Sequence, residues 1–256
     1  MNENKALVGL NNEIEFVKKF NENNDLVILE KMGISTNNVL AVHLKSTIYS
    51  EYHEKKVYPK SDIFLIKNII NREFLVEENF YINEDNKLLK DSFNNLFIPN
   101  SGISIKLKTN RYTIHKMGPT FFSNVFKIPE LGVGASIYCK KNEEINKNQK
   151  IYSAWGSNKE QVQKYFSEAL GYNLNLENLN DLKRVKQFSN ETIKKMIKED
   201  DYISDLIFKG KYAQDPYCAN WIYDHKGFRK INTKEDFKVT TGSGRSKGAY
   251  TLVIKP

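Results

Sequence analysis

Two short segments carry residue types that suit the hydrolysis of a phosphodiester bond. Asp62 lies in the apolar run 61–66 (SDIFLI), and Lys106 lies in the alternating run 102–108 (GISIKLK) further along the chain. This reaction needs a divalent cation that activates water and neutralises charge on phosphorus. An aspartate is a hard oxygen ligand for Mg²⁺. A lysine ammonium is a compact charge that can hold the attacking water or a phosphoryl oxygen.

Ser104 and Ile105 extend this chemistry along the same predicted strand. Side chains alternate between the faces of a strand, so Ser104 shares the polar face of Lys106 and Lys108. Ser104 can assist through a water molecule, and the backbone carbonyl of Ile105 offers a further metal ligand. We therefore expect Asp62 and the Ile105 carbonyl to hold Mg²⁺.

Glu13 is a further acidic candidate, on a first helix predicted over about 5–21. It falls inside the apolar arc formed by Leu7, Leu10, Ile14, Phe16, Val17 and Phe20. A buried carboxylate without a partner is costly, so we expect a metal ion or Lys106 to be the partner of Glu13. A boundary position from which the carboxylate reaches water is the alternative.

The segments 59–66 (PKSDIFLI) and 102–119 (GISIKLKTNRYTIHKMGP) resemble the PD-(D/E)xK nuclease superfamily, especially small type II restriction endonucleases. The resemblance implies Asp62 and Lys106 as catalytic residues. It also implies a glutamate in a G-xxx-E arrangement on the first helix, which Gly9 and Glu13 match. Mg²⁺ is the implied cofactor, double-stranded DNA the implied substrate, and a cognate DNA methyltransferase the implied functional partner.

The match departs from the superfamily pattern at two positions. Pro59 lies three residues before Asp62 instead of next to it, and the second acidic position is occupied by Ser104. With one carboxylate fewer, both one bound metal ion and two remain open.

The elements that must position these residues predict a mixed α/β (α+β) fold. We expect a first helix at about 5–21 and a last helix at about 190–209. Between them, a helix should begin near the capping box formed by Ser157 and Glu160 and end at Gly171. Strands are expected at 61–66, 102–108, 218–224, 228–232 and 249–255, with connections at 142–150 and 171–181. The pattern indicates a central mixed β-sheet flanked by helices, and the resemblance implies a restriction-endonuclease-like core.

The length of 256 residues fits one domain over 1–256. We expect a catalytic core over about 1–140 and a helical and C-terminal DNA-recognition region over about 150–256. The second region contains the Gly-rich turn 241–248 (TGSGRSKG), which lacks the helix that must follow a phosphate-binding P-loop. A flexible hairpin and a DNA-contacting turn are equally compatible with this segment.

The charge balance favours a polyanionic partner. There are 39 Lys and Arg against 31 Asp and Glu, a net charge of +8. The candidate DNA contacts are Lys108, Arg111, His115, Lys116, Asn220, Arg229, Lys230, Arg245 and Lys247.

Other classes of protein and site are disfavoured. Two cysteines are too few for a disulfide framework, and the four histidines lack the spacing of a zinc site. No apolar run reaches the roughly 18 residues of a membrane span, and the N-terminus lacks a signal pattern, so a cytoplasmic protein is expected, as monomer or homodimer. Two other functions stay open. One is a structure-selective repair or junction nuclease, and the other is a non-catalytic DNA-binding protein, which Ser104 favours.

Overall fold

The computed structural model describes residues 3–23, 25–36, 38–44, 59–86, 89, 96–106, 112–210, 217–242, 244 and 248–256. The chain forms two compact units, each built from two stretches of sequence. Unit 1 comprises Met1–Tyr112 and Asp205–Thr233, and unit 2 comprises Thr113–Ser204 and Lys234–Pro256. This division differs from the expected catalytic core over about 1–140, because unit 1 ends at Tyr112 and resumes at Asp205.

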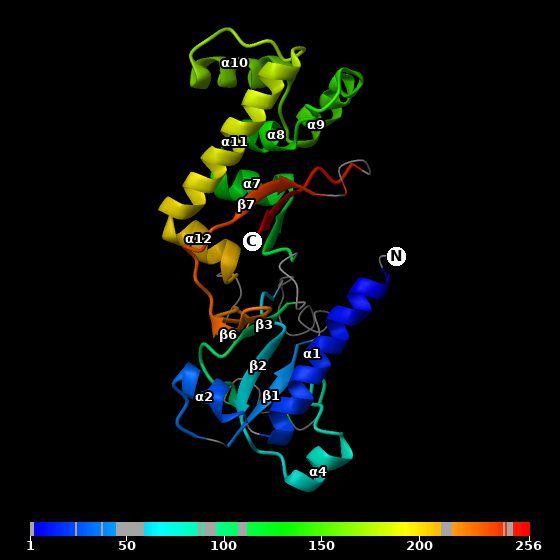
Figure 1. Cartoon of the computed structure of the whole chain (residues 1–256), viewed down its shortest axis with the longest axis vertical. Helices are drawn as coiled ribbons and strands as arrows, with labels where there is room; N and C mark the ends of the chain where they lie inside the picture. Colours follow the sequence, from blue (N-terminus) through cyan, green and yellow to red (C-terminus); the bar gives the residue numbers. More distant parts are fainter. Residues whose placement is uncertain are drawn as a thin grey trace. The chain divides into compact units, whose positions relative to one another are not determined.

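Unit 1 is a mixed sheet with helices beside it (Figure 1). Its helices are α1 (Glu3–Asn23), α2 (Leu26–Met32) and α4 (Arg72–Glu77), and α12 (Asp201–Phe208) enters it from unit 2 along the chain. Its strands are β1 (Val39–His43), β2 (Ile63–Lys67), β3 (Ile103–Ile105), β5 (Trp221–Asp224) and β6 (Gly227–Lys230). The expected mixed α and β architecture is confirmed at this coarse level.

The five strands have the order β1-β2-β3-β5-β6. β1, β2 and β3 are antiparallel neighbours, with Ala41 opposite Leu65 and Ile63 opposite Ile103. β5 runs parallel to β3, with Ile105 opposite Tyr223, and the hairpin β5–β6 completes the sheet. A parallel pair needs a long crossover connection, and here the intervening chain forms most of unit 2.

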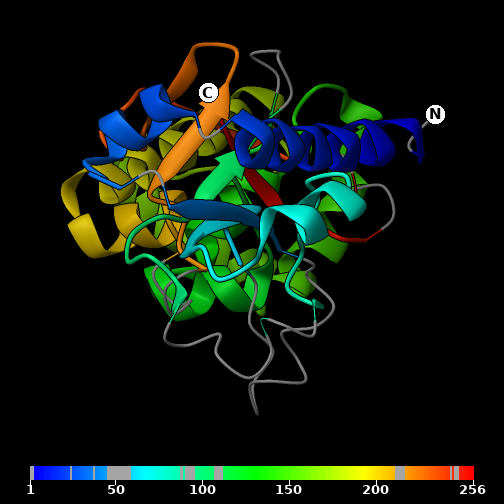
Figure 2. The ribbon, with the colours of Figure 1, turned by 90° about the horizontal axis from the view of Figure 1, so that it is seen from below.

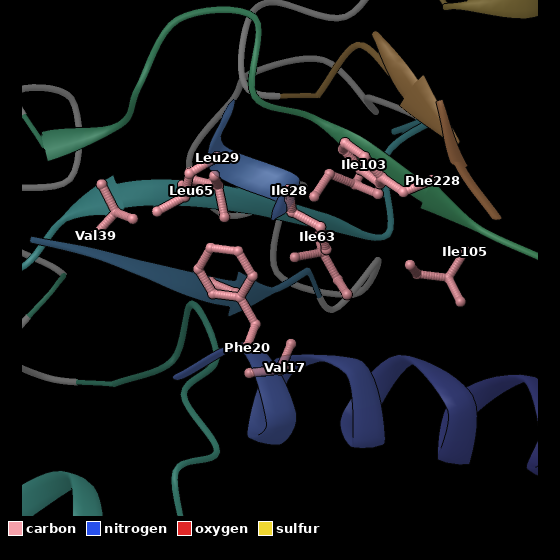
Figure 3. Packing of buried hydrophobic residues seen from close by; sticks show 11 residues of the cluster. Val17, Phe20, Ile28, Leu29, Val39, Ile63, Leu65, Ile103, Ile105 and Phe228 are labelled. Atoms are coloured by element: carbon pink, nitrogen blue, oxygen red, sulfur yellow. The ribbon is translucent and has the colours of Figure 1, made fainter. Parts of the chain in front are cut away.

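The sheet of unit 1 is covered on both faces by apolar clusters. Val17 and Phe20 of α1 point toward the first face (Figure 3), which also includes Ile28, Leu29, Val39, Ala41, Ile63, Leu65, Ile103, Ile105 and Phe228. The opposite cluster consists of Leu40, Val42, Leu44, Phe64, Ile66, Ile70, Leu75, Ile82, Leu89 and Tyr217. The strand predicted at 61–66 is therefore confirmed as β2, and its burial on both faces follows from alternate side chains entering different clusters.

The outer edge of β1 is closed by α1, which lies along this strand in Figure 2. The buried Asn21 side chain donates to the Ala41 and Phe80 carbonyls at 3.0 Å each and accepts from the Ala41 N–H at 2.7 Å. The next outward-facing residue, His43, pairs with the carbonyl of Ile82 and the N–H of Glu84. These bonds satisfy the backbone groups that an edge strand otherwise leaves open.

Unit 2 combines a three-stranded sheet with helices. Its helices are α7 (Pro119–Phe126), α8 (Pro129–Ser136), α9 (Asn148–Ala154), α10 (Lys159–Leu170) and α11 (Leu179–Glu199), with the 3₁₀ helix η1 (Asn142–Lys147). The strands β4 (His115–Met117), β7 (Lys238–Thr241) and β8 (Leu252–Lys255) form an antiparallel sheet in the order β4-β8-β7. α8 packs closely against α11, because Gly134 has no side chain where a Cβ would lie 2.1 Å from Ser189 Oγ.

Three predicted elements differ from the structure. The expected connection 142–150 is wrong, because η1 and α9 occupy this segment. The capping box of α10 is formed by Asn158 and Gln161, one residue after the predicted pair Ser157 and Glu160. The single helix predicted at 190–209 is two helices, because Asp200 is extended (ψ 109°) and its side chain accepts from the N–H of Ile203 at the start of α12.

Within the described ranges, no helix is long and apolar enough to cross a membrane.

We predict that Asn21→Ala lowers the free energy of unfolding by about 2–3 kcal/mol, because it leaves buried backbone groups of β1 without partners. Urea denaturation followed by circular dichroism measures the change. Asn23→Ala is the matched control, since the exposed Asn23 side chain donates to the Lys19 carbonyl of its own helix. An equal loss in the two variants contradicts the role given to Asn21.

Candidate active site

Asp62 and Lys106 lie side by side at one end of the sheet in unit 1. Asp62 directly precedes β2 and Lys106 directly follows β3, and antiparallel pairing brings the start of one strand beside the end of the other. Lys106 Nζ lies 3.5 Å from Asp62 Oδ2, with 24% of the Lys106 side chain and 26% of the Asp62 side chain exposed. The expected proximity of the two groups is therefore confirmed.

The carboxylate of Asp62 is held by the neighbouring strand. Its Oδ2 accepts a hydrogen bond from the backbone N–H of Ile105 at 2.7 Å and from the hydroxyl of Ser104 at 3.1 Å. Both donors belong to β3, so the carboxylate position follows the strand backbone. No hydrogen bond from the described part of the chain reaches Asp62 Oδ1, which leaves this oxygen available to a ligand.

The backbone carbonyl of Ile105 faces the same side of β3 as Asp62. The Ile105 N–H points toward Asp62, whereas the next N–H, that of Lys106, donates to the Tyr223 carbonyl on the other side at 2.9 Å. In a strand the N–H and C=O of one residue point in the same direction. Ile105 therefore offers a second oxygen on the side where Asp62 lies.

These donors fit a magnesium ion that keeps most of its ligands as water. Mg²⁺ is usually held by one or two carboxylates together with waters and substrate phosphates. Asp62 and the Ile105 carbonyl supply hard oxygens of this kind. Among the residues that the structure describes, no group of three or more His, Cys, Asp or Glu could hold a metal ion. The site is therefore sparse in protein ligands.

Glu13 contacts a histidine instead of the Asp62–Lys106 pair. Its Oε2 lies 3.0 Å from Nε2 of the buried His43, and His43 Nδ1 lies 2.7 Å from the Tyr81 hydroxyl. His43 alternates along β1 with Val39 and Ala41, which face α1. The Glu13 carboxylate thus has His43 of β1 as its partner, where a metal ion or Lys106 was expected. This contact links the first helix to the sheet.

Lys60 is a second lysine of the site, and it was not among the residues expected from the sequence. Its pKa is lowered from 10.5 to about 7: burial is the main cause, the positive charge of Lys106 also lowers the pKa, and the negative charge of Asp62 opposes the change. Gly210 makes room for its stem, because a Cβ at Gly210 would lie 2.3 Å from Lys60 Cγ. The sequence signal that could have identified Lys60 is its position two residues before Asp62. In an extended chain, residues two apart have their side chains on the same face.

The predicted DNA contacts of unit 1 lie in different places. Arg229 Nη2 is 2.9 Å from Asp224 Oδ2, whose side chain is fully buried and also accepts from the Tyr112 hydroxyl at 3.0 Å. The Arg229 guanidinium is thus part of an internal network. Asn220 precedes β5 and Lys230 ends β6, so both lie at the end of the sheet opposite to Lys106. Lys108 and Arg111 lie outside the described residues.

The predicted contacts of unit 2 include one exposed and one half-buried residue of β4. Lys116 is exposed, whereas His115 packs against Phe121 with ring centroids 4.8 Å apart. Arg245 and Lys247 lie outside the described residues, in the connection between β7 and β8.

A cleft of about 130 Å³ opens beside Lys106 within unit 1. Two aromatic rings, Phe16 of α1 and Tyr223 of β5, form part of its wall, with centroids 5.4 Å apart. The other lining residues are Asn12, Glu15, Lys19, Phe20, Asp25, Ile28 and Ile105. Lys106 is thus the member of the Asp62–Lys106 pair that lines this cleft.

No family model and no curated protein matches the sequence. The resemblance to PD-(D/E)xK nucleases accordingly rests on the residues of the two segments alone.

We predict that Lys60→Met changes the pH dependence of stability. The pKa of Lys60 is about 7 in the folded chain against 10.5 for an ordinary solvated lysine, so between these pH values the unfolded state binds more protons. The free energy of unfolding of the wild type therefore rises with pH relative to the variant, by at most about 1.4 kcal/mol per pH unit. Urea denaturation from about pH 6.5 to 9.5 measures this difference.

The exposed Lys67, at the end of β2, provides the control for this series. Lys67→Met should keep a constant offset from the wild type over the same pH range. If the curve for Lys60→Met also runs parallel to that of the wild type, the pKa assigned to Lys60 is wrong.

Proposed function

We propose that this chain is a magnesium-dependent endonuclease that cuts double-stranded DNA at a short specific sequence, as type II restriction enzymes do. The observation that carries the proposal is the 3.5 Å approach of Lys106 Nζ to Asp62 Oδ2, with the carboxylate bonded to the backbone of Ile105. As part of the proposal, the five-stranded sheet of unit 1 serves as a restriction-endonuclease-like core.

The charges at the site suit a phosphodiester substrate. Lys106 and Lys60 lie near one aspartate, and the positive charge of Lys106 contributes to the lowered pKa of Lys60. An anionic phosphate relieves this repulsion when it approaches both amines. The site is also only partly exposed, so its charges are screened less by salt than surface charges are.

Each residue has a defined part in the proposed reaction. Water attacks phosphorus, the bond to the 3′ oxygen breaks, and the products carry a 5′-phosphate and a 3′-hydroxyl. Lys106 stabilises the negative charge that develops on the phosphoryl oxygens. Asp62 and the Ile105 carbonyl would hold Mg²⁺, which supplies charge neutralisation and activation of water. Ser104 and the Ile105 N–H keep the Asp62 carboxylate in position.

The proposal includes a biological partner and is compatible with a monomer or a homodimer. A site-specific nuclease endangers the DNA of its own cell, so a cognate DNA methyltransferase that modifies the same sequence is the implied partner. Glu13, whose Oε2 lies 3.0 Å from His43 Nε2, is the proposed further carboxylate ligand of the metal ion.

We predict that Asp62→Ala and Lys106→Ala each reduce the rate of DNA cleavage by about 10³-fold, because charge stabilisation in the transition state is lost. Cleavage of plasmid DNA in Mg²⁺ measures the rate, and binding to a duplex in Ca²⁺ should persist. Lys67→Ala removes a lysine at the far end of β2 and should keep full activity. Full activity of either site variant removes its assigned role.

We further predict that digestion of a long DNA in Mg²⁺ gives fragment ends that share one short sequence. Sequencing of the ends measures this directly. Cleavage without a common sequence, or cleavage only at branches, identifies a structure-selective nuclease instead. Metal-independent binding with no cleavage identifies a non-catalytic DNA-binding protein, for which Ser104 in place of an acid is the supporting observation.

A further inference from the structure

The three-stranded sheet of unit 2 has two chemically different faces. In the register of the strands, Lys116 of β4 lies opposite Val253 of β8, and Val253 lies opposite Thr240 of β7. Lys238 of β7 lies opposite Lys255 of β8. Since residues alternate between faces along each strand, these five residues share one face.

The other face is covered by helices. It contains the buried Met117, Val239, Leu252 and Ile254. α8 and α11 pack on it: Thr241 Oγ1 donates to the Ala135 carbonyl of α8 at 3.1 Å and contacts Lys186 Nζ of α11 at 3.0 Å. The first face is therefore the one that these two helices leave uncovered.

We call the uncovered set Lys116, Lys238 and Lys255 the lysine face; all three side chains are exposed. None of them forms an ion pair or a side-chain hydrogen bond within the described part of the chain. β4, β7 and β8 contain no Asp or Glu. Some other lysines of unit 2 are neutralised: Lys194 and Lys198 both pair with Asp236.

The pairing of Lys238 with Lys255 is unfavourable in the isolated protein. Residues directly opposite in an antiparallel pair have Cβ atoms about 4.5–5.5 Å apart, and like charges there are destabilising. Lysines on edge strands can serve to prevent sheet-to-sheet aggregation, which would account for Lys116 and Lys238 on the edge strands β4 and β7. Lys255 lies on the central strand of this sheet, so edge protection does not explain it.

We propose that the lysine face of unit 2 binds the phosphate backbone of double-stranded DNA. This inference deepens the proposed function and rests on DNA being the substrate. A polyanion with regularly spaced charges relieves the repulsion among the three lysines, and each contact releases counterions. The contacts carry affinity and orientation without sequence information, because they reach phosphates only.

The composition of the face favours DNA over a membrane or a protein partner. Besides the lysines it contains Thr240 and the buried Val253, and none of the large exposed hydrophobic side chains of the described residues belongs to it. Amphipathic membrane binding and the centre of a protein interface both require exposed apolar side chains. Charge is therefore the chemistry that this face offers.

The test is the salt dependence of DNA binding by the full chain. For the variant K116A/K238A/K255A, we predict that the slope of log K against log salt becomes shallower by about 2.7, which is about 0.9 for each phosphate contact. Between about 50 and 200 mM salt, the loss of affinity should then be about 40-fold smaller than in the wild type. Fluorescence anisotropy with a labelled duplex in Ca²⁺ measures binding without cleavage.

The control variant is K150A/K164A/K183A, which removes three exposed lysines of α9, α10 and α11 in the same unit. It should change the slope by less than about 1, and K116R/K238R/K255R should retain the wild-type slope. Thermal melts followed by circular dichroism verify that each variant is folded. Equal slope changes in the two alanine variants, or no change in K116A/K238A/K255A, overturn the proposal.

Two further results separate this inference from the proposed function. If the wild type binds DNA with the predicted slopes but cleaves none, the lysine face stands and the nuclease proposal fails. If the lysine face variant loses binding to anionic vesicles or to an acidic protein while its DNA binding is unchanged, the lysine face serves another partner and this inference fails.

Discussion

The candidate site depends on one hydrogen bond, from the backbone N–H of Ile105 to Asp62 Oδ2 at 2.7 Å. A backbone amide within a sheet cannot move independently of its strand, so the carboxylate takes its position from the sheet itself. Lys106 is the next residue, and its own N–H is bonded to Tyr223 on the opposite side. The Asp62 carboxylate and the backbone of Lys106 are thereby held by consecutive N–H groups, so under the proposed function the pair is arranged before a substrate binds.

The packing of unit 1 holds β2 and β3, the two strands of the candidate site, inside the sheet. β2 is buried on both faces, and β3 lies between β2 and β5, so neither strand of the site is an edge. The edge strand β1 is held by Asn21, while Glu13 reaches His43 on the same strand. Two polar side chains of α1 thus fasten the helix to β1, about two turns apart. The contact between Glu13 and His43 therefore connects α1 to β1, independently of any catalytic role of the Glu13 carboxylate.

Local pattern was sufficient for the parts of this arrangement that depend on alternation. The predicted strands at 61–66 and 102–108 and the apolar arc of the first helix follow from short-range periodicity. The proximity of Asp62 to Lys106, 44 residues further along the chain, was expected from the order of the two segments and from their resemblance to PD-(D/E)xK nucleases. The partner of Glu13 is 30 residues away in sequence and belongs to a strand that was not predicted, so no local pattern could identify it. The lowered pKa of Lys60 arises from burial, which depends on tertiary packing around Gly210. The break at Asp200 results from a side-chain cap that competes with helix continuation.

The lysines of the candidate site in unit 1 and those of the lysine face in unit 2 differ in burial, and therefore in how strongly salt screens their charges. Lys60 and Lys106 are partly buried beside a carboxylate, where desolvation makes each charge interact strongly with its neighbours. Lys116, Lys238 and Lys255 are exposed, and their interactions fall off over a Debye length of about 8 Å at physiological salt. Raising the salt concentration therefore weakens the exposed set first and leaves the buried pair almost unchanged. Under the proposed function, the salt concentration adjusts affinity for the polyanion, whereas the fold fixes the groups that act at the reacting phosphate.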